Sequence, residues 1–353
     1  MHKFDSVEKY YDYKDVLILP KASKINSRSQ VNLTRTFKFN NGLTWTGVPI
    51  IAANMTTVGT LDVYKTLVKH KIITALHKFI KLQDLIDYNT NNSNPNDLLD
   101  PNYFAISTGI SNNDFENLVN IMDNFDCKWI VIDIANGYID NFKSFCKKVR
   151  EKYTNKIIIA GNVSTKEGVN DLLECGIDIV KVGIGGGSAC TTRIQTGIGM
   201  PQFSCVLKCS QVKKNNAYII SDGGITCPGD MAKSFGAGAD FVMVGGEFAG
   251  HYENPGEIIE ENGQKYKFFY GMSSSYAMEN NYSANNNTNY RSSEGREIKV
   301  KYKGKLNNTI ENYLGGLRST CTYTNSLCIE SLNTNCKFIL VNNQYNTNLV
   351  NEK

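Results

Sequence analysis

Eight short apolar runs recur along the middle of this chain, and their rhythm limits the fold more than any other feature. They cover residues 49–54, 73–76, 103–108, 129–134, 156–160, 178–184, 217–221 and 240–244. Helix-length segments separate the runs, and most runs are followed by Gly, Asn, Asp or Thr. Runs that are apolar throughout are typical of parallel strands covered on both faces. Eight such units in about 200 residues predict an α/β fold, a closed (β/α)8 or TIM barrel rather than an open sheet.

The rest of the chain is divided around this barrel. Residues 1–47 read as an irregular leader, in which residues 14–20 could form a strand that closes the barrel floor. Residues 48–250 hold barrel strands 1–8, and residues 270–305 form an excursion that could be a flap over the rim. The asparagine excess within that excursion could also be compositional bias alone. Residues 306–353 form a C-terminal segment, and 353 residues fit one such barrel domain.

Composition and cysteine usage exclude several classes of function. The net charge of +4 comes from 38 basic and 34 acidic residues without a basic stripe, so we expect no nucleic-acid partner. None of the ten cysteines forms a Cys-x-x-Cys pair, and four histidines offer no zinc spacing. No apolar run has membrane-spanning length, and residues 1–13 lack the apolar core of a signal peptide. Free thiols favour a reducing, cytoplasmic compartment.

The sixth run breaks into a glycine loop that carries the strongest candidate for chemistry. Gly185–Ser188 has much backbone freedom, so its amides can approach a ligand closely or adopt positive φ. Cys190 follows, beside two threonines and Arg193. A thiol on such a loop, next to a guanidinium, could act as a nucleophile. The alternative is a plain glycine turn with an inert, packed cysteine. The position at the carboxyl end of a barrel strand favours the nucleophile.

Two further glycine loops follow the seventh and eighth runs. The first is Asp222-Gly223-Gly224 and the second is Gly245-Gly246. The loops after strands seven and eight form the usual phosphate site of such barrels. Amides freed by glycine near a helix N-terminus can hold a phosphate without a lysine. Asp222 could then accept hydrogen bonds from ribose hydroxyls. Each loop alone could be a tight turn, but their place on adjacent strands favours phosphate binding.

For several other polar segments, the residues alone leave both a functional role and a structural role open. Residues 270–273 could close over a base and phosphate or form a plain turn. Glu294 lies between two segments rich in glycine and serine, where most glutamates are solvated. The turn at residues 27–29 could bind phosphate, although a solvated turn is favoured. Three further rim residues, His77, Asp133 and Asn162, receive no role from spacing.

Together these motifs resemble the inosine monophosphate (IMP) dehydrogenase/guanosine monophosphate (GMP) reductase family. The resemblance extends from about residue 10 to about residue 340. The matching pieces are residues 14–20, 47–55, 133–138, 160–163, 182–199, 221–224, 236–250, 270–274, 294–295 and 314–319. The chain departs from the family pattern at Gly186, where proline is expected, and at Thr56, where an acid is expected.

The resemblance implies NADPH-dependent reductive deamination of GMP to IMP and ammonia. Cys190 would attack C2 of the purine and give a covalent thioimidate once ammonia has left. Thr192 and Glu294 would relay a proton to the departing amine. A covalent step is reasonable because an exocyclic amine on an aromatic ring leaves poorly until C2 becomes tetrahedral.

Two rival functions remain. An IMP dehydrogenase shares the cysteine loop, but it usually carries inserted CBS modules after the second strand, for which residues 80–102 leave no room. A non-catalytic purine-nucleotide sensor on the same barrel would not need Cys190, Thr192 and Glu294 together.

The same resemblance assigns three sets of binding residues. The GMP set, in which Asp222 takes the ribose, is Ser188, Asp222, Gly223, Gly224, Gly245, Gly246, Tyr270, Gly271, Met272, Ser273, Arg291, Ser292, Ser293 and Gly295. The NADPH set is Ser27, Arg28, Lys78, Asp133, Ile134, Ala135, Tyr290, Arg291, Ser319, Thr320, Cys321 and Thr322. Within it, Ser27 and Arg28 would come from a neighbouring subunit of a homotetramer. A monovalent cation, K⁺, would be held by carbonyls of Gly185, Gly187 and Cys190, with Arg193 nearby.

Overall fold

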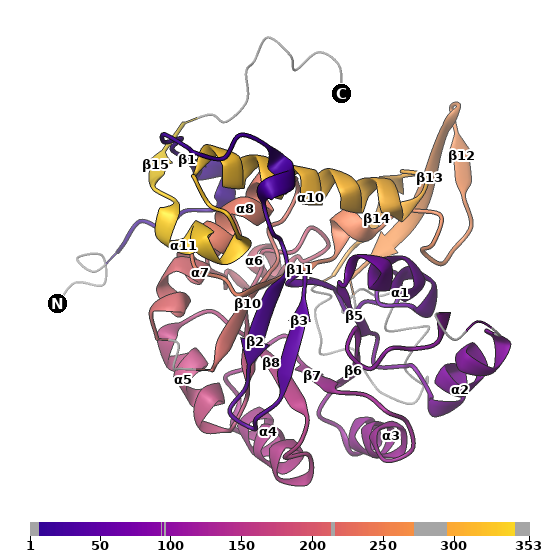
Figure 1. Cartoon of the computed structure of the whole chain (residues 1–353). Helices are drawn as coiled ribbons and strands as arrows, with labels where there is room; N and C mark the ends of the chain where they lie inside the picture. The colour runs from indigo at the N-terminus through magenta and orange to yellow at the C-terminus, as the bar shows by residue number, and fades with distance from the viewer. Residues whose placement is uncertain (1–6, 93, 95–96, 213–215, 272–294, 343–353) are drawn as a thin grey trace.

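Eight parallel strands close into a barrel at the centre of the molecule (Figure 1). The computed structural model describes residues 7–92, 94, 97–212, 216–271 and 295–342. Around the barrel the strands follow the order β10-β11-β4-β5-β6-β7-β8-β9. Their bounds are β4 (Ile50–Ala52), β5 (Ile73–Leu76), β6 (Phe104–Thr108), β7 (Trp129–Asp133), β8 (Ile157–Val163), β9 (Ile179–Val182), β10 (Tyr218–Asp222) and β11 (Phe241–Val244). These are the eight apolar runs, so the predicted TIM barrel is confirmed.

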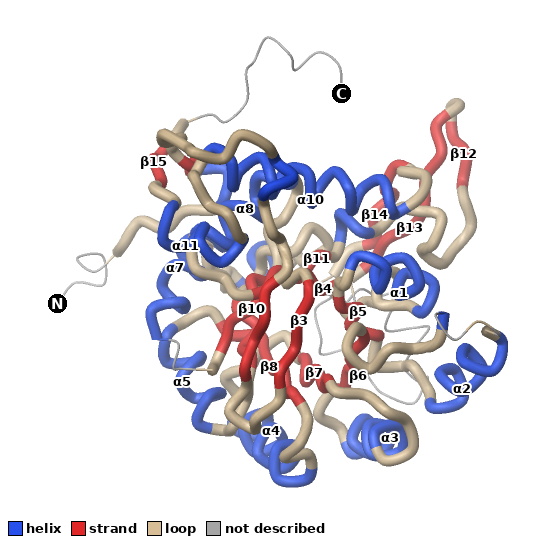
Figure 2. The backbone as a smooth tube through the Cα atoms, in the orientation of Figure 1, coloured by secondary structure: helices blue, strands red, loops and turns tan. Residues whose placement is uncertain are grey.

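Helices connect successive strands and surround the barrel (Figure 2). They are α1 (Leu61–Leu67), α2 (Leu82–Asn91), α3 (Asn112–Met122), α4 (Asp140–Lys152), α5 (Lys166–Glu174), α6 (Thr192–Thr196), α7 (Gln202–Cys209) and α8 (Pro228–Gly236). Side-chain oxygens of Thr60, Ser111 and Thr165 accept hydrogen bonds from the first-turn amides of α1, α3 and α5. Each cap satisfies an amide that has no partner within its helix, which fixes where these helices begin. No helix in the described part of the chain is long and apolar enough to cross a membrane.

Along each strand, successive side chains point in turn toward the barrel axis and toward the surrounding helices. In β9, Ile179 belongs to the apolar cluster inside the barrel, together with Trp129 of β7. Val180 and Val182 pack instead in the cluster between strands and helices. Because side chains alternate along a strand, Lys181 shares the inward face with Ile179. A charged side chain therefore lies in the barrel interior.

A hairpin that the sequence analysis did not predict closes the barrel floor. Strands β2 (Arg35–Lys38) and β3 (Thr44–Gly47) pair antiparallel. Phe37 and Trp45 are buried in the interior cluster, and the ring of Phe37 stacks on Phe241 with centroids 4.2 Å apart. These large rings fill the end of the barrel, so the leader is not wholly irregular.

The strand predicted within residues 14–20 exists but does not lie at the floor, so that part of the prediction is wrong. Strand β1 (Val16–Ile18) pairs antiparallel with β15 (Phe338–Leu340) from the C-terminal segment. The short helix before it, Tyr13–Asp15, places the Tyr13 hydroxyl 2.9 Å from Ser221 Oγ in β10. The leader is thereby attached to the rim side of the barrel.

The C-terminal third adds a small sheet and a long helix. Strands β12 (Ile259–Glu261), β13 (Gln264–Tyr270) and β14 (Glu297–Lys301) form an antiparallel sheet beside the barrel. The expected excursion at 270–305 therefore contains a regular strand, and residues 272–294 lie outside the described part. Helix α10 (Leu306–Tyr323) packs on α8 and on a short helix at Arg28–Gln30. Helix α11 (Leu332–Asn335) precedes β15.

Candidate active site

The candidate nucleophile lies on the loop that follows β9. Cys190 is half-buried, and its thiol Sγ donates a hydrogen bond to Thr192 Oγ1 at 3.1 Å. Thr192 begins helix α6, so the hydroxyl is held by the first turn of a helix. The thiol and the hydroxyl that the sequence analysis expected to act together are therefore in direct contact. A proton can pass between them without an intervening group.

Glycines shape this loop because side chains would not fit. Gly183 has φ +144°, and a Cβ there would lie 2.1 Å from the carbonyl oxygen of Asp222. Gly185 has φ +80°, and its Cβ would lie 2.6 Å from Arg193 Cγ. Both positions combine positive φ with backbone or side-chain collision, so they require glycine. At Gly186 the nearest atom to a Cβ is 3.3 Å away, and that glycine, the departure from the family pattern, is not required by packing.

Arg193 anchors the loop. Its Nη1 donates to Asp12 Oδ2 at 3.0 Å, and its Nη2 donates to the carbonyl oxygen of Met200 at 2.7 Å. From the sequence this cation was expected to act on the Cys190 thiol, whereas these bonds join it to the leader and to the end of the loop. The carbonyl of Gly187 accepts the amide of Cys190 at 3.0 Å, which folds the loop back at the nucleophile. Among the described residues, no group of three or more His, Cys, Asp or Glu is arranged for a metal ion. A cation at this loop would depend on backbone carbonyls.

The described residues on either side of segment 272–294 contact the cysteine loop or one another. Gly295 forms an antiparallel β-bridge with Cys190, and the Arg296 amide donates to the carbonyl of Ala189 at 3.1 Å. The amide of Gly271 donates to the carbonyl of Arg296 at 3.2 Å. The Arg296 guanidinium also donates to the carbonyl of Ser188 through Nε (3.2 Å) and Nη2 (3.0 Å).

Sequence reasoning missed Arg296, which has no distinguishing pattern around it. Tyr270 ends β13 and is half-buried next to Gly271. Seven predicted residues, Met272, Ser273, Tyr290, Arg291, Ser292, Ser293 and Glu294, lie outside the described residues.

Glycine loops after β9, β10 and β11 converge beside the nucleophile. A Cβ on Gly246 would lie 2.5 Å from Ser188 Oγ. Gly223 has φ +100°, and its Cβ would lie 3.0 Å from backbone atoms of Gly186 and Gly187. These short separations show that the three predicted loops meet at one place. A hydroxyl and several glycine backbones together suit an anion such as phosphate.

A buried lysine connects two acidic residues across the barrel mouth. Lys181 Nζ lies 2.9 Å from Asp133 Oδ1 and 3.2 Å from Asp222 Oδ2. Asn54 Nδ2 donates to the other oxygen of Asp133, and Asn162 Nδ2 donates to Asp222 Oδ2, each at 2.8 Å. Burial opposes the charge on Lys181, but the two carboxylates outweigh burial and raise the pKa of the ammonium. Asp133 and Asp222 are therefore held in place by three side chains, Lys181, Asn54 and Asn162, with which they form one network.

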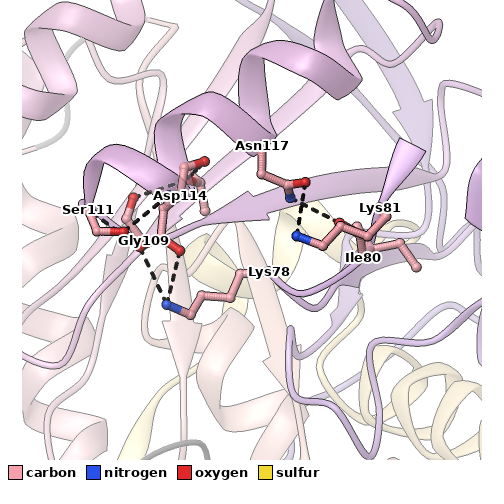
Figure 3. Close-up of polar contacts among 8 residues, drawn as sticks. Lys78, Ile80, Lys81, Gly109, Ser111, Asp114 and Asn117 are labelled. Carbon is pink, nitrogen blue, oxygen red and sulfur yellow. Dashed lines mark hydrogen bonds and ion pairs between the residues drawn. The ribbon is translucent and has the colours of Figure 1, made fainter. Parts of the chain in front are cut away.

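The expected cofactor residue Lys78 lies at the rim on the loop after β5 (Figure 3). Its Nζ lies 3.2 Å and 3.5 Å from the two oxygens of Asp114, near the N-terminus of α3. Asp114 also accepts from the amide and hydroxyl of Ser111. Burial raises the pKa of Asp114, but Ser111 and Lys78 outweigh it and lower that pKa. Ile134 and Ala135 follow β7 at the same rim, where Ala135 is exposed.

The remaining cofactor residues lie elsewhere in the chain. Ser27 caps the short helix that contains Arg28, and this helix packs on α10, which carries Ser319–Thr322. Figure 1 shows α10 and α3 at opposite edges of the molecule. Cys321 is fully buried, so its side chain packs in the core. Within a single chain, the expected NADPH residues therefore form two groups that lie apart from each other.

Comparisons with known proteins agree with this geometry. Residues 10–347 match the family model described as IMP dehydrogenase / GMP reductase domain. The chain is 48% identical over 339 residues to GMP reductase 1 of Homo sapiens, covering 95% of this chain and 96% of that protein. It is 48% identical over 337 residues to GMP reductase of Klebsiella pneumoniae, covering 95% of each.

A crystal structure of a Trypanosoma brucei GMP reductase variant in complex with guanosine 5′-monophosphate has the same fold. It aligns with a TM-score of 0.85 over 97% of both chains, at 22% identity. The resemblance predicted from the motifs is thus confirmed, and the chain belongs to the IMP dehydrogenase/GMP reductase family.

Proposed function

We propose that this chain catalyses the NADPH-dependent reductive deamination of GMP to IMP and ammonia. Relatives that are GMP reductases match it across 95% of its length. The observation that carries the proposal is the contact between Cys190 Sγ and Thr192 Oγ1, at a point where three glycine loops meet. A binding protein would not need a thiol and a hydroxyl in contact beside an anion site.

The proposed chemistry begins at the thiol. Cys190 Sγ loses its proton and forms a bond to C2 of the purine, which becomes tetrahedral. A proton delivered to the exocyclic nitrogen lets the C2–N bond break, so ammonia leaves and a thioimidate remains. Thr192 Oγ1 is placed to pass protons at this step, and Glu294 would exchange them with it. NADPH, when bound, would supply the hydride that C2 requires, and the C2–S bond would then break to release IMP and regenerate the Cys190 thiolate.

Binding of the substrate phosphate is assigned to Ser188 and the glycine loops. Ser188 Oγ and the backbone of Gly246 are close enough to contact the same group. Gly223 and Gly224 approach from the neighbouring loop, and Asp222 at the end of β10 would accept ribose hydroxyls. Carbonyls of Gly185, Gly187 and Cys190 would hold K⁺, since oxygen atoms are the ligands that hard cations take.

The cofactor is proposed to lie between subunits of a homotetramer. Lys78 and Asp133–Ala135 lie at the rim, whereas Ser319–Thr322 lie in α10 and Arg28 lies in the short helix that packs on it. Since one chain keeps the two groups apart, a neighbouring subunit would supply the second. Ten free cysteines favour a reducing, cytoplasmic location.

One assay separates the proposed function from its rivals. Purified protein is mixed with GMP and NADPH, and nicotinamide absorbance and ammonia are followed together. Loss of NADPH with an equal release of ammonia is the expected result. NADH formed from IMP and NAD would identify a dehydrogenase instead. Tight GMP binding without turnover in either mixture would identify a nucleotide sensor.

A further inference from the structure

Lys181 is a buried charge that the proposed chemistry does not use. It lies in β9, is 1% exposed and shares the inward strand face with Ile179. Moving an ammonium group from water into a protein interior is costly unless its charge is compensated by good partners. A methionine would fill the same volume at no such cost. A lysine here therefore calls for a reason beyond packing.

Its partners supply that reason. The two carboxylates that flank Lys181 Nζ are those expected to bind the two nucleotides: Asp222 the ribose of GMP, and Asp133 the cofactor. Their side chains are 22% and 30% exposed, whereas that of Lys181 is 2% exposed. The ammonium thus lies behind both carboxylates, away from solvent. It can hold them in place but has little access to a ligand.

The amides complete a continuous network across the barrel mouth. Asn54 holds one end through Asp133, and Asn162 holds the other through Asp222. Asn162 also donates to the carbonyl of Gly183 at 2.8 Å, at the start of the cysteine loop. A shift of either carboxylate must therefore move the ammonium group of Lys181 and, through it, the other carboxylate.

We propose that Lys181 is a positioning residue that couples the GMP and NADPH sites by holding Asp222 and Asp133 from a shared position behind them. This rests on the proposed function, since it takes the two carboxylates as nucleotide ligands. When one nucleotide fixes its carboxylate, Lys181 is fixed with it. The second carboxylate is then already oriented, so the second nucleotide binds more tightly. Such a coupling is reciprocal between the two ligands.

The test is to mutate a residue of one nucleotide site and to measure binding at the other nucleotide site. NADPH binding is followed by its fluorescence in the absence of GMP, so no turnover occurs. Asp222→Asn removes a carboxylate from the proposed GMP site. We expect this change to weaken NADPH binding roughly three- to tenfold, which is the size of coupling found between residues of one ion-pair network. In the Lys181→Met background the same Asp222→Asn change should leave NADPH affinity unchanged. Lys181→Met by itself should weaken both nucleotides by roughly 10- to 100-fold.

A second measurement uses ligands only. IMP and NADPH form an unreactive pair, and in the wild-type protein each should tighten binding of the other by the same factor. In Lys181→Met that factor should fall to one. Arg150→Met is the matched control, because it removes an ion pair between Arg150 of α4 and the buried Asp178, which directly precedes the amino end of β9. It should lower the melting temperature without changing the coupling.

The outcomes separate the two proposals. A wild-type protein that binds neither nucleotide contradicts the proposed function, and the coupling with it. A wild type that binds both, with NADPH affinity indifferent to Asp222→Asn, contradicts the coupling alone. An equal effect of Asp222→Asn with and without Lys181 also contradicts it, because the coupling would then bypass the ammonium. If Lys181→Met fails to fold, the effect of Asp222→Asn in the wild-type background and the wild-type ligand pair still decide the question.

Discussion

Gly246→Ala tests the proposed phosphate site with the smallest possible change. The new Cβ would lie 2.5 Å from Ser188 Oγ, so that hydroxyl must move. The next two atoms, Ser188 Cβ at 3.6 Å and Phe269 Cε1 at 3.7 Å, are at ordinary contact distances. Gly246 does not adopt positive φ, so alanine is allowed there. The fold should therefore tolerate the methyl group, while the proposed phosphate site would lose both space and a hydrogen-bond donor.

The expected size follows from the interaction that is lost. A hydrogen bond to a charged group contributes about 1.5–3 kcal/mol, which corresponds to roughly a 10- to 100-fold rise in the KM for GMP. The value of kcat should change much less, because Cys190 and Thr192 are not touched. The melting temperature should stay within a few degrees, since a rotating serine absorbs the collision.

The assay compares GMP with guanosine, which lacks the phosphate. Gly246→Ala should reduce the preference for GMP over guanosine by the same 10- to 100-fold, because only the phosphate contact is damaged. Gly315→Ala in α10 is the control: nothing lies within 4 Å of its Cβ, and replacing a helical glycine should stabilise the protein by about 0.5–1 kcal/mol. An unchanged preference for GMP in Gly246→Ala would refute the assignment of this loop to the phosphate.

Three other outcomes test the site and the fold. Cys190→Ser should reduce turnover on the order of 10⁴-fold or more while GMP affinity stays within a few fold, measured by single-turnover kinetics and calorimetry; near-normal turnover would exclude the covalent mechanism. Phe37→Ala removes a ring from the barrel floor and should cost about 3–5 kcal/mol in denaturant unfolding, with GMP affinity unchanged, whereas a cost below 1 kcal/mol would mean that the floor is not closed by this ring. Burial, aided by nearby Lys303, lowers the pKa of His251 from 6.5 to about 4, so between these values the unfolded chain binds a proton that the folded protein does not. Stability should therefore fall by up to about 3 kcal/mol as pH drops from 6.5 to 4, and His251→Gln should flatten that slope unless other groups cause it.

The barrel could be predicted because its strands are buried on both faces. Such strands appear as continuous apolar runs, and their number and spacing leave few alternatives. The floor could not be predicted in the same way. Phe37 and Trp45 lie on short strands that alternate buried and exposed residues, and nothing local indicates that the hairpin they form turns into the barrel. Strand β1 was recognised as a strand, but its partner β15 lies more than 300 residues away.

The candidate site was predicted where backbone freedom marks it in the sequence. Glycines after β9, β10 and β11 indicated loops that approach a ligand, and Ser188 and Gly246 do lie together. Arg296 was missed because its contact with Ser188 depends on how β13 and β14 return to the cysteine loop. Arg193 was recognised as close to the loop, but its partner Asp12 comes from the leader, which no local pattern connects to it.

Lys181 was missed although a signal was present. It lies in an otherwise apolar run, two residues after Ile179, so a parallel strand must direct both side chains inward. The same spacing holds on two other strands. In β7, Asp133 lies two residues after the inward-facing Val131, and in β10, Asp222 lies two residues after the inward-facing Ile220. Apolar layers thus end in a charged layer at the carboxyl ends of the strands, where barrel chemistry occurs. A lysine on that layer can be accommodated only if carboxylates share it, and the three side chains meet for that reason.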